Sequence, residues 1–137
     1  MIVHVPLSPE HLDGTREHWQ PWLERIAKDI GCHVHDLIGQ AYIGDIKLHV
    51  AWDDEANKSL ALLGARILKR GDASIAELAW CTGESLDLWS GLLPDIEAFY
   101  RNHWGCKNLT AHCRPGWKPF LKRHAYRMTH VIMDKEL

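Results

Sequence analysis

Glu77 is the first residue that could take part in a reaction. It is a carboxylate within an otherwise apolar stretch, SIAELAWC, at residues 74–81. A carboxylate in such surroundings can accept a proton from an amine and so act as a general base. The alternative is a glutamate on the solvent-facing side of a strand, which is common. Two roles are therefore open for Glu77, that of a proton acceptor and that of a surface residue.

A strongly basic region lies further along the chain. Between residues 107 and 127 there is no acidic residue, and there are six basic ones: Lys107, Arg114, Lys118, Lys122, Arg123 and Arg127. Such a surface attracts phosphate groups or an acidic partner, whereas the alternative is a basic helix face that meets only solvent. The candidate interface residues are Arg114, Trp117, Lys118, Lys122 and Arg123. Nucleic acid is a weaker candidate partner, because the formal net charge of the whole chain is −2.

Two groups of cysteines and histidines contain the residue types that bind metal ions. They are Cys32, His33 and His35, and Cys106, His112 and Cys113. Their spacing matches neither paired C-x-x-C knuckles nor H-E-x-x-H, so we predict buried thiols and hydrogen-bonded histidines and no metal site. A nucleophile pair of Cys113 and His124 has the right residue types but no supporting local motif.

The composition is that of a globular protein with a single domain, residues 1–137. Hydrophobic residues make up 46% of the chain and charged residues 25%, which is ordinary usage for a folded protein. We find no apolar run long enough for a membrane span and no signal-peptide pattern. We therefore expect a cytosolic protein with reduced cysteines and no membrane partner.

The first third of the chain predicts a short strand at residues 2–5 and two helices. Apolar residues recur at three- and four-residue spacing over residues 19–30, which indicates a helix with one buried stripe. Pro21 should kink or split that helix, because proline lacks the N–H that an interior position requires. A second, shorter helix is predicted over residues 34–41.

Three strands should follow as an antiparallel meander, at residues 46–52, 60–68 and 74–81. The first of them alternates apolar and polar residues, which predicts that Lys47 and His49 lie on a solvent-facing side.

The remaining residues predict a helix, a strand, a helix and a last strand. The first helix should contain Pro94 in its first turn and begin near Ser90. The others are expected at residues 108–113, 116–124 and 127–134. The predicted order is βααβββαβαβ, an α/β (mixed α+β) fold with a mixed central sheet and helices on both faces. A right-handed crossover should make the strands at 74–81 and 108–113 parallel.

This order and the closing unit resemble the GNAT acyltransferase family. The most specific part is residues 105–137, GCKNLTAHCRPGWKPFLKRHAYRMTHVIMDKEL, in which a strand leads to a helix, a corner and a last strand. Ala125 and Tyr126 stand where the family has a Gly-Phe corner. The chain is also similar to small GNAT-like proteins of tailed phages and prophages, which often have an R-x-G-W or R-P turn like that at Arg114.

The resemblance implies an acyl-CoA site between two parallel strands that splay apart. In the family, the pantetheine arm pairs with the backbone of the first splayed strand, and the pyrophosphate binds amides at the following helix N-terminus. By position, the implied cofactor-binding residues are Trp80, Cys81, Thr82, Gly83 and Ser85. Glu77 stands mid-strand, where some enzymes of the family have a general base, so the resemblance makes it the candidate catalytic residue.

The loop at residues 82–91, TGESLDLWSG, departs from the family pattern R/Q-x-x-G-x-G/A. It has no Arg or Gln, and it places Glu84 and Asp87 near where a pyrophosphate would lie. Leu121 stands at the position of the family's general-acid tyrosine and cannot donate a proton. Trp80 and Trp117 should flank the cleft and could close it. We therefore predict that acetyl-CoA binds weakly or not at all, so that no cofactor is expected unless the chain is an active enzyme.

Two functions follow from the resemblance and its departures. The favoured one is a non-catalytic phage protein, a virion structural or assembly component in the host cytoplasm or the virion. Its partners would be other virion or assembly proteins, or a second copy of itself. The alternative is an acetyl-CoA-dependent N-acyltransferase with an atypical cofactor loop. Inhibition of a host enzyme is a third possibility.

Overall fold

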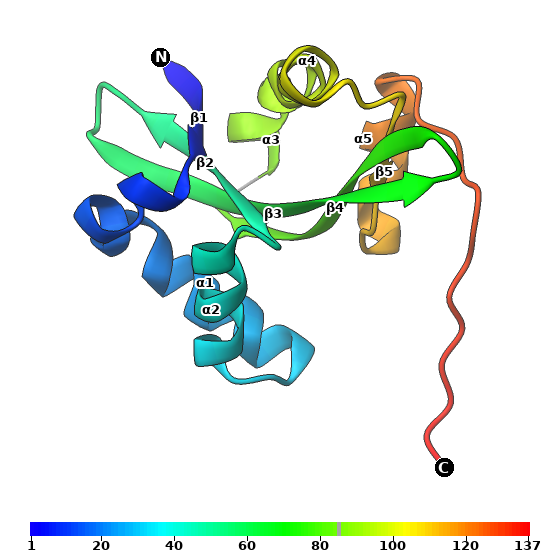
Figure 1. Cartoon of the computed structure of the whole chain (residues 1–137), viewed down its shortest axis with the longest axis horizontal. Helices are drawn as coiled ribbons and strands as arrows, with labels where there is room; N and C mark the ends of the chain where they lie inside the picture. Colours follow the sequence, from blue (N-terminus) through cyan, green and yellow to red (C-terminus); the bar gives the residue numbers. More distant parts are fainter. Residues whose placement is uncertain (85) are drawn as a thin grey trace.

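A five-stranded mixed sheet forms the centre of the protein, in a computed structural model that describes residues 1–84 and 86–137 (Figure 1). The strands lie in chain order: β1 (Ile2–Leu7), β2 (Lys47–Asp53), β3 (Lys58–Arg70), β4 (Ala73–Gly83) and β5 (Asn108–Ala111). The pairs β1–β2, β2–β3 and β3–β4 are antiparallel, and the pair β4–β5 is parallel. The mixed sheet and the parallel pair are as the sequence predicts.

Helices cover both faces of this sheet. On one face lie α1 (Arg16–Ile30) and α2 (Val34–Ile43), and on the other lie α3 (Leu86–Trp89), α4 (Leu93–Trp104) and α5 (Lys118–Arg123) (Figure 1). The described residues also contain four short 3₁₀ turns, each of which lies before a helix: Pro9–His11, Asp13–Thr15, Ser90–Leu92 and Pro115–Trp117. Pro94 lies in the first turn of α4, as predicted.

Each face has its own hydrophobic core. The core under α1 and α2 is built around Trp19, Leu23, Leu48, Leu62 and Trp80. The core under α3, α4 and α5 is built around Leu63, Leu78, Ile96, Tyr100 and Phe120. Alternate residues of the central strands supply the two cores, because successive side chains of a strand point to opposite faces.

Helix α1 continues through Pro21 as a single element, so the prediction of a split helix is wrong. Pro21 is exposed, while Trp19, Leu23 and Ile26 on the opposite side are buried in the core. Burial of that apolar stripe stabilises the helix more than one missing backbone hydrogen bond destabilises it. The helix ends at Gly31, whose φ of 75° requires the left-handed conformation that glycine adopts readily.

His49 is fully buried, which corrects the prediction that its side of β2 faces solvent. Helix α4 covers that side of the strand, and the rings of Phe99 and Tyr100 contact His49 with centroids 5.3 Å away. The imidazole is hydrogen bonded at both nitrogens, to His4 Nε2 at 2.8 Å and to the Tyr100 hydroxyl at 2.6 Å. A buried polar group is tolerated when its hydrogen bonds are satisfied in this way.

The last predicted strand, residues 127–134, is not formed in the described structure, where the order is βααβββαβα. After Tyr126 the chain runs away from the sheet in an extended conformation (Figure 1). A strand requires a neighbour to satisfy its backbone groups, and these residues have none within the described part of the chain.

Candidate functional site

The parallel strands β4 and β5 separate partway along their length. Their pairing ends at Leu78 and Ala111, whereas β4 continues five residues further, to Gly83. On its other side β4 stays paired with β3 up to Gly83. Residues 79–83 of β4 therefore have one backbone edge that is not paired with β5, as the splayed-strand expectation requires.

A bulge at Ala79 lies at the point where the strands separate. Ala65 pairs with Leu78 and Gly64 pairs with Trp80, so Ala79 has no opposite residue on β3. A bulge of this kind bends the strand that contains it and increases its local twist. The change in direction of β4 therefore coincides with the end of its pairing to β5.

The Trp80 side chain is buried on the α1–α2 face and lies directly over Gly64. A Cβ at position 64 would overlap the Trp80 ring, so glycine is required there. Trp117 packs into the core on the opposite face. The two tryptophans therefore do not flank one cleft, contrary to the expectation from the sequence.

The other implied cofactor residues follow Trp80 along β4. Cys81 is half-buried on the α3–α5 face, and burial raises the pKa of its thiol to about 12. Thr82 is buried, and Gly83 lies so close to Ala61 of β3 that a Cβ would overlap it. Ser85, predicted to bind the cofactor, lies outside the described residues.

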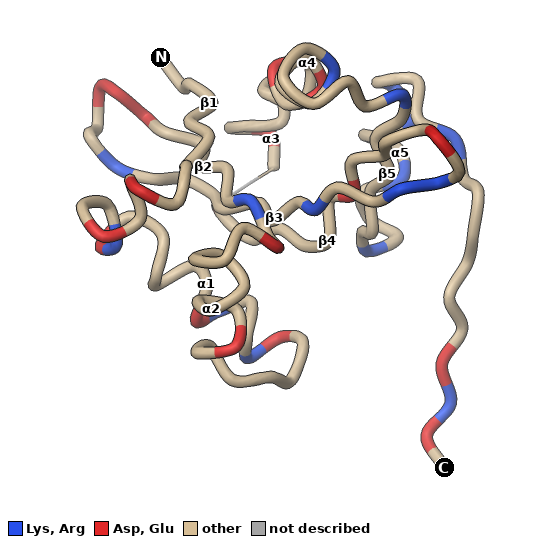
Figure 2. Tube along the Cα trace, viewed as in Figure 1, with Lys and Arg blue, Asp and Glu red and all other residues tan. Residues whose placement is uncertain are grey.

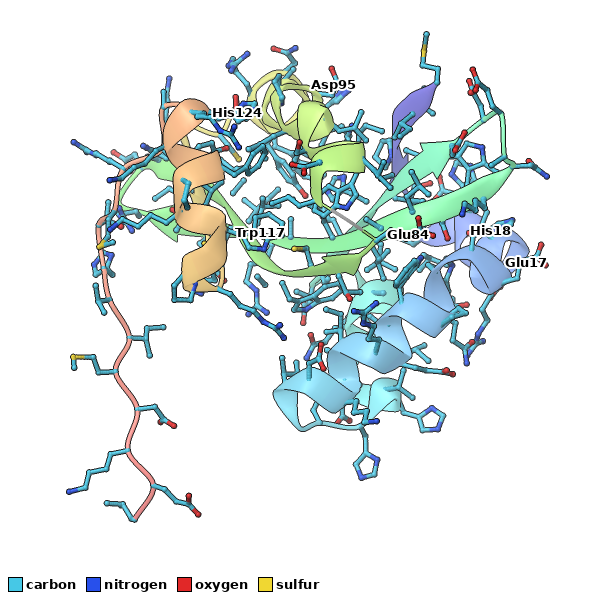
Figure 3. All side chains as sticks on the ribbon, turned by 180° about the vertical axis from the view of Figure 1, so that it is seen from behind. Glu17, His18, Glu84, Asp95, Trp117 and His124 are labelled. Atoms are coloured by element: carbon cyan, nitrogen blue, oxygen red, sulfur yellow. The ribbon has the colours of Figure 1, made fainter. Side chains whose placement is uncertain are left out.

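The loop after β4 offers little to a pyrophosphate. Helix α3, which follows it, is only four residues long, so few aligned peptide dipoles stand behind its N-terminus. Glu84 projects from the end of β4, and its Oε1 lies 3.2 Å from Lys58 Nζ (Figure 3). The lysine offsets the charge of Glu84 but leaves no surplus positive charge from this pair for a phosphate.

A pair of tryptophans joins the segments that follow the two separated strands. Trp89 at the end of α3 and Trp117 just before α5 have ring centroids 5.5 Å apart. Trp89 is buried and donates a hydrogen bond from its indole nitrogen to the Glu84 carbonyl, at 3.1 Å. The pair closes the split on the α3–α5 face.

Glu77 lies on the opposite face of β4, because its neighbours Ala76 and Leu78 both point into the core under α3, α4 and α5. Its carboxylate is 16% exposed and lies between two nitrogens. Arg66 Nε, directly across on β3, is 3.6 Å from Oε1, and His112 Nε2, just after β5, is 3.6 Å from Oε2. Glu77 is thus neither isolated nor on a fully solvated surface.

An open groove of about 700 Å³ lies between the sheet and α2, with the end of α1 at its margin. Arg66 and Trp80 line it on the sheet side, and Cys32, His35 and Asp36 line it on the helix side. Arg66 connects the groove to Glu77, because it lines the groove and also forms the ion pair with the Glu77 carboxylate. A small molecule bound there would lie on the α1–α2 side of the sheet, next to Arg66.

The position of the family's acid is occupied by Leu121, which is buried in the core. The nearby Tyr126 donates a hydrogen bond from its hydroxyl to Glu97 of α4, at 2.9 Å. Burial, followed by the contact with Glu97, raises the pKa of Tyr126 far above its usual range. Tyr126 is therefore held as a structural donor and does not replace the missing acid.

The basic residues gather around α5 and β5 at one end of the sheet (Figure 2). Lys118, Lys122 and Arg123 are exposed and have no acidic partner within 4.0 Å among the described residues. Arg114 is also exposed and lies 3.7 Å from Asp29 at the end of α1. Four of the five predicted interface residues are thus exposed, and the fifth, Trp117, packs inward.

The cysteines and histidines do not assemble a metal site. Among the described residues no three His, Cys, Asp or Glu side chains lie close enough together to hold an ion, and all four cysteines are free. In that same part of the chain, none of the helices has the length and apolarity required to cross a membrane.

Sequence reasoning missed two members of this site, Arg66 and the role of His112 beside Glu77. A basic residue in the apolar stretch LALLGARIL was the available signal, because a charge within a central strand requires a partner.

Comparison with known proteins bears on the fold. No family model matches the chain, and no curated protein matches it by sequence. Solved structures do match. A probable acetyltransferase superposes with a TM-score of 0.73 at 11% identity, over 98% of this chain and 96% of the other. Glucosamine-6-phosphate N-acetyltransferase from Arabidopsis thaliana gives 0.66 at 12%, over 99% and 98%. A GNAT family acetyltransferase from Staphylococcus aureus gives 0.65 at 16%, over 99% and 98%.

The fold is that of the GNAT acetyltransferases. At these identities the likeness establishes the fold alone. The phage origin and the virion role expected from the sequence stay predictions.

Proposed function

We propose that this protein is an acyl-CoA-dependent N-acyltransferase that acts on an amine bound in the groove beside Glu77. The observation that carries the proposal is the free edge of β4 at residues 79–83, which opens where β4 and β5 separate. Backbone amides on a free strand edge can pair with the amides of a pantetheine arm. Acetyl-CoA supplies the activated acyl thioester, and the fold shared with acetyltransferases supports this choice.

The reaction requires a base more than it requires an acid. The amine nitrogen forms a bond to the acyl carbon, the carbon–sulfur bond breaks, and the amine proton passes to the Glu77 carboxylate. The side chain of Arg66, whose Nε lies 3.6 Å from Glu77 Oε1, lines the groove and holds the carboxylate at its edge. The departing thiolate leaves unassisted at neutral pH, because the pKa of a thiol is only about 8.5. The absence of a tyrosine at position 121 is therefore compatible with transfer.

The cofactor end of the site supports only weak binding. The four-residue α3 and the Lys58–Glu84 pair give the pyrophosphate few partners, so the pantetheine arm has to provide most of the affinity.

Release of free CoA thiol from acetyl-CoA, measured over a panel of primary amines, tests the proposal. Glu77→Gln should lower kcat/KM by roughly a hundredfold or more, because it removes the base and keeps the shape of the side chain. Glu97→Gln is the matched control, since Glu97 is a partly buried carboxylate that contacts Tyr126 and not the groove. No amine-dependent thiol release by the wild-type protein would refute the proposal.

A non-catalytic role in an assembly is the second candidate, and the Trp89–Trp117 contact that closes the split favours it. The exposed Lys118, Lys122 and Arg123 would then contact an acidic partner. Reversing all three to Glu should abolish incorporation into particles. Incorporation of the wild-type protein should weaken as salt is added, since each exposed ion pair contributes only about 0.2–1 kcal/mol and several are needed together. Normal incorporation combined with measurable acetyl transfer would exclude this role.

A further inference from the structure

We propose that two copies of this protein form a closed dimer by exchanging residues 127–137. In each copy this segment adds as a strand to the open edge of β5 in the other copy. We call residues 127–137 the trailing segment. This inference does not depend on acyl transfer. It rests on the segment itself, on the edge it would join, and on the reach between them.

The trailing segment has the composition of a buried strand but lies in solvent. Its apolar side chains are among the most exposed in the structure: Met128 57%, Val131 69%, Ile132 85% and Met133 91%. Thr129, Val131 and Ile132 are β-branched, and residues 128–133 contain no Gly, Pro or charged residue. The apolar residues fall on both faces of the expected strand, which is typical of a strand covered on both sides.

The backbone of the trailing segment is also without partners. The last backbone hydrogen bonds before it are those of Ala125 and Tyr126 to Lys122 and Leu121, and within the described chain residues 127–137 make none. An apolar segment with unpaired N–H and C=O groups is a template for strand pairing.

The outer edge of β5 is the matching surface. β5 is the last strand of the sheet and pairs only with β4. Ala111 pairs with Leu78, and the His112 N–H donates to the Leu78 carbonyl of β4, so by alternation the N–H groups of Leu109 and Ala111 point to the open side. The strand carries no proline and no charge, the two devices that usually protect an edge. The opposite edge strand, β1, carries Pro6.

Geometry favours a second copy as the occupant. The segment runs away from its own sheet beyond Tyr126, which is fixed by its bond to Glu97 (Figure 1). Eleven extended residues span roughly 36 Å, which is more than twice the radius of gyration of a domain of this size, about 14 Å. Because both copies carry a segment and an edge, a reciprocal exchange satisfies both and closes the assembly as a symmetric dimer.

Light scattering coupled to size-exclusion chromatography tests the exchange. The full chain should have about twice the mass of one 15.7 kDa chain. The pair Val131→Lys and Ile132→Lys should give a monomer, and so should Ala111→Pro, which removes an outward N–H from β5. The matched control, Lys135→Gln with Glu136→Gln, lies beyond the apolar stretch and should remain dimeric. Circular dichroism establishes that each variant is folded.

Mixing the two monomeric variants gives the sharpest result. One still has a functional segment and the other a functional edge, so together they should form a heterodimer that neither forms alone. A monomeric full chain, including one in which the Ala111 amide is protected from exchange by its own segment, would overturn the proposal. A dimer that persists in both variants, or a mixture that stays monomeric, would also overturn it.

Discussion

Trp117 packs against Trp89 with ring centroids 5.5 Å apart, and this contact closes the gap between the segments that follow β4 and β5. The two residues are far apart in the sequence but each follows one of the separated strands. The contact explains how the strands can part without leaving an open channel. The same two rings are the first barrier that the pantetheine arm of a thioester would meet.

Removing the Trp117 ring should therefore strengthen binding of acetyl-CoA. For Trp117→Ala we expect an affinity roughly tenfold higher, equivalent to about 1.4 kcal/mol, together with lower stability because core contacts are lost. Calorimetry with acetyl-CoA measures the first effect and urea unfolding the second. Trp104→Ala is the control, because Trp104 is a half-exposed residue of α4 that contacts Lys47. Weaker binding by Trp117→Ala would mean that the indole holds the ligand and does not exclude it.

Gly64 should be irreplaceable only while Trp80 is present. Gly64→Ala places a methyl group within the Trp80 ring, so it should destabilise the protein by about 1–3 kcal/mol. In a Trp80→Leu background the same change should cost much less, and the two changes should be strongly non-additive in a double-mutant cycle. Additive costs in urea unfolding would contradict the account of the bulge, in which the close approach of these residues accompanies the register shift at Ala79.

The free energy of unfolding should decrease as the pH is lowered, because His49 is buried in its neutral form. Burial, with smaller contributions from His4 and Lys47, lowers the pKa of His49 from 6.5 to about 3. Between those values the unfolded chain binds the proton and the folded chain does not, so stability is lost as pH falls below about 6.5. The slope from this group approaches about 1.4 kcal/mol per pH unit. Burial lowers the pKa of His4 as well, which adds to the effect in the same direction.

The variant His49→Gln separates this group from the rest of the protein. It should be less stable at pH 7, because it disturbs the bonds to His4 and Tyr100, but its free energy of unfolding should depend less steeply on pH between 6.5 and 4. Urea titrations at several pH values measure both slopes. Equal slopes for the two proteins would show that His49 is not the titrating group.

The sequence predicts the parallel strands well, because a helix between two strands permits few connections. It does not predict the burial of His49, since alternation along β2 cannot show that α4 covers the second face of the strand. Nor does it reveal the Arg66–Glu77 pair, because the two residues meet only in the register that the bulge at Ala79 defines.

The last predicted strand and Trp117 show a second limit of prediction from the sequence. The apolar, β-branched pattern of residues 127–134 is a genuine strand signal, but a strand forms only beside a neighbour, and one chain does not reveal where that neighbour lies. The fate of Trp117 is similar. Its position near the split follows from the sequence, whereas its contact with Trp89 depends on how α3 and α5 pack.

The central claim is that the free edge of β4 holds the pantetheine arm of an acyl-CoA. Titration of the full chain with acetyl-CoA, followed by amide chemical shifts, tests it most directly. We predict a Kd of roughly 10 µM to 1 mM, or about −7 to −4 kcal/mol, with shifts at residues 79–83. Acetyl-pantetheine, which lacks the nucleotide, should bind within about tenfold of acetyl-CoA, because the loop after β4 offers the pyrophosphate few partners. Unchanged amides at residues 79–83 in millimolar acetyl-CoA would contradict the account.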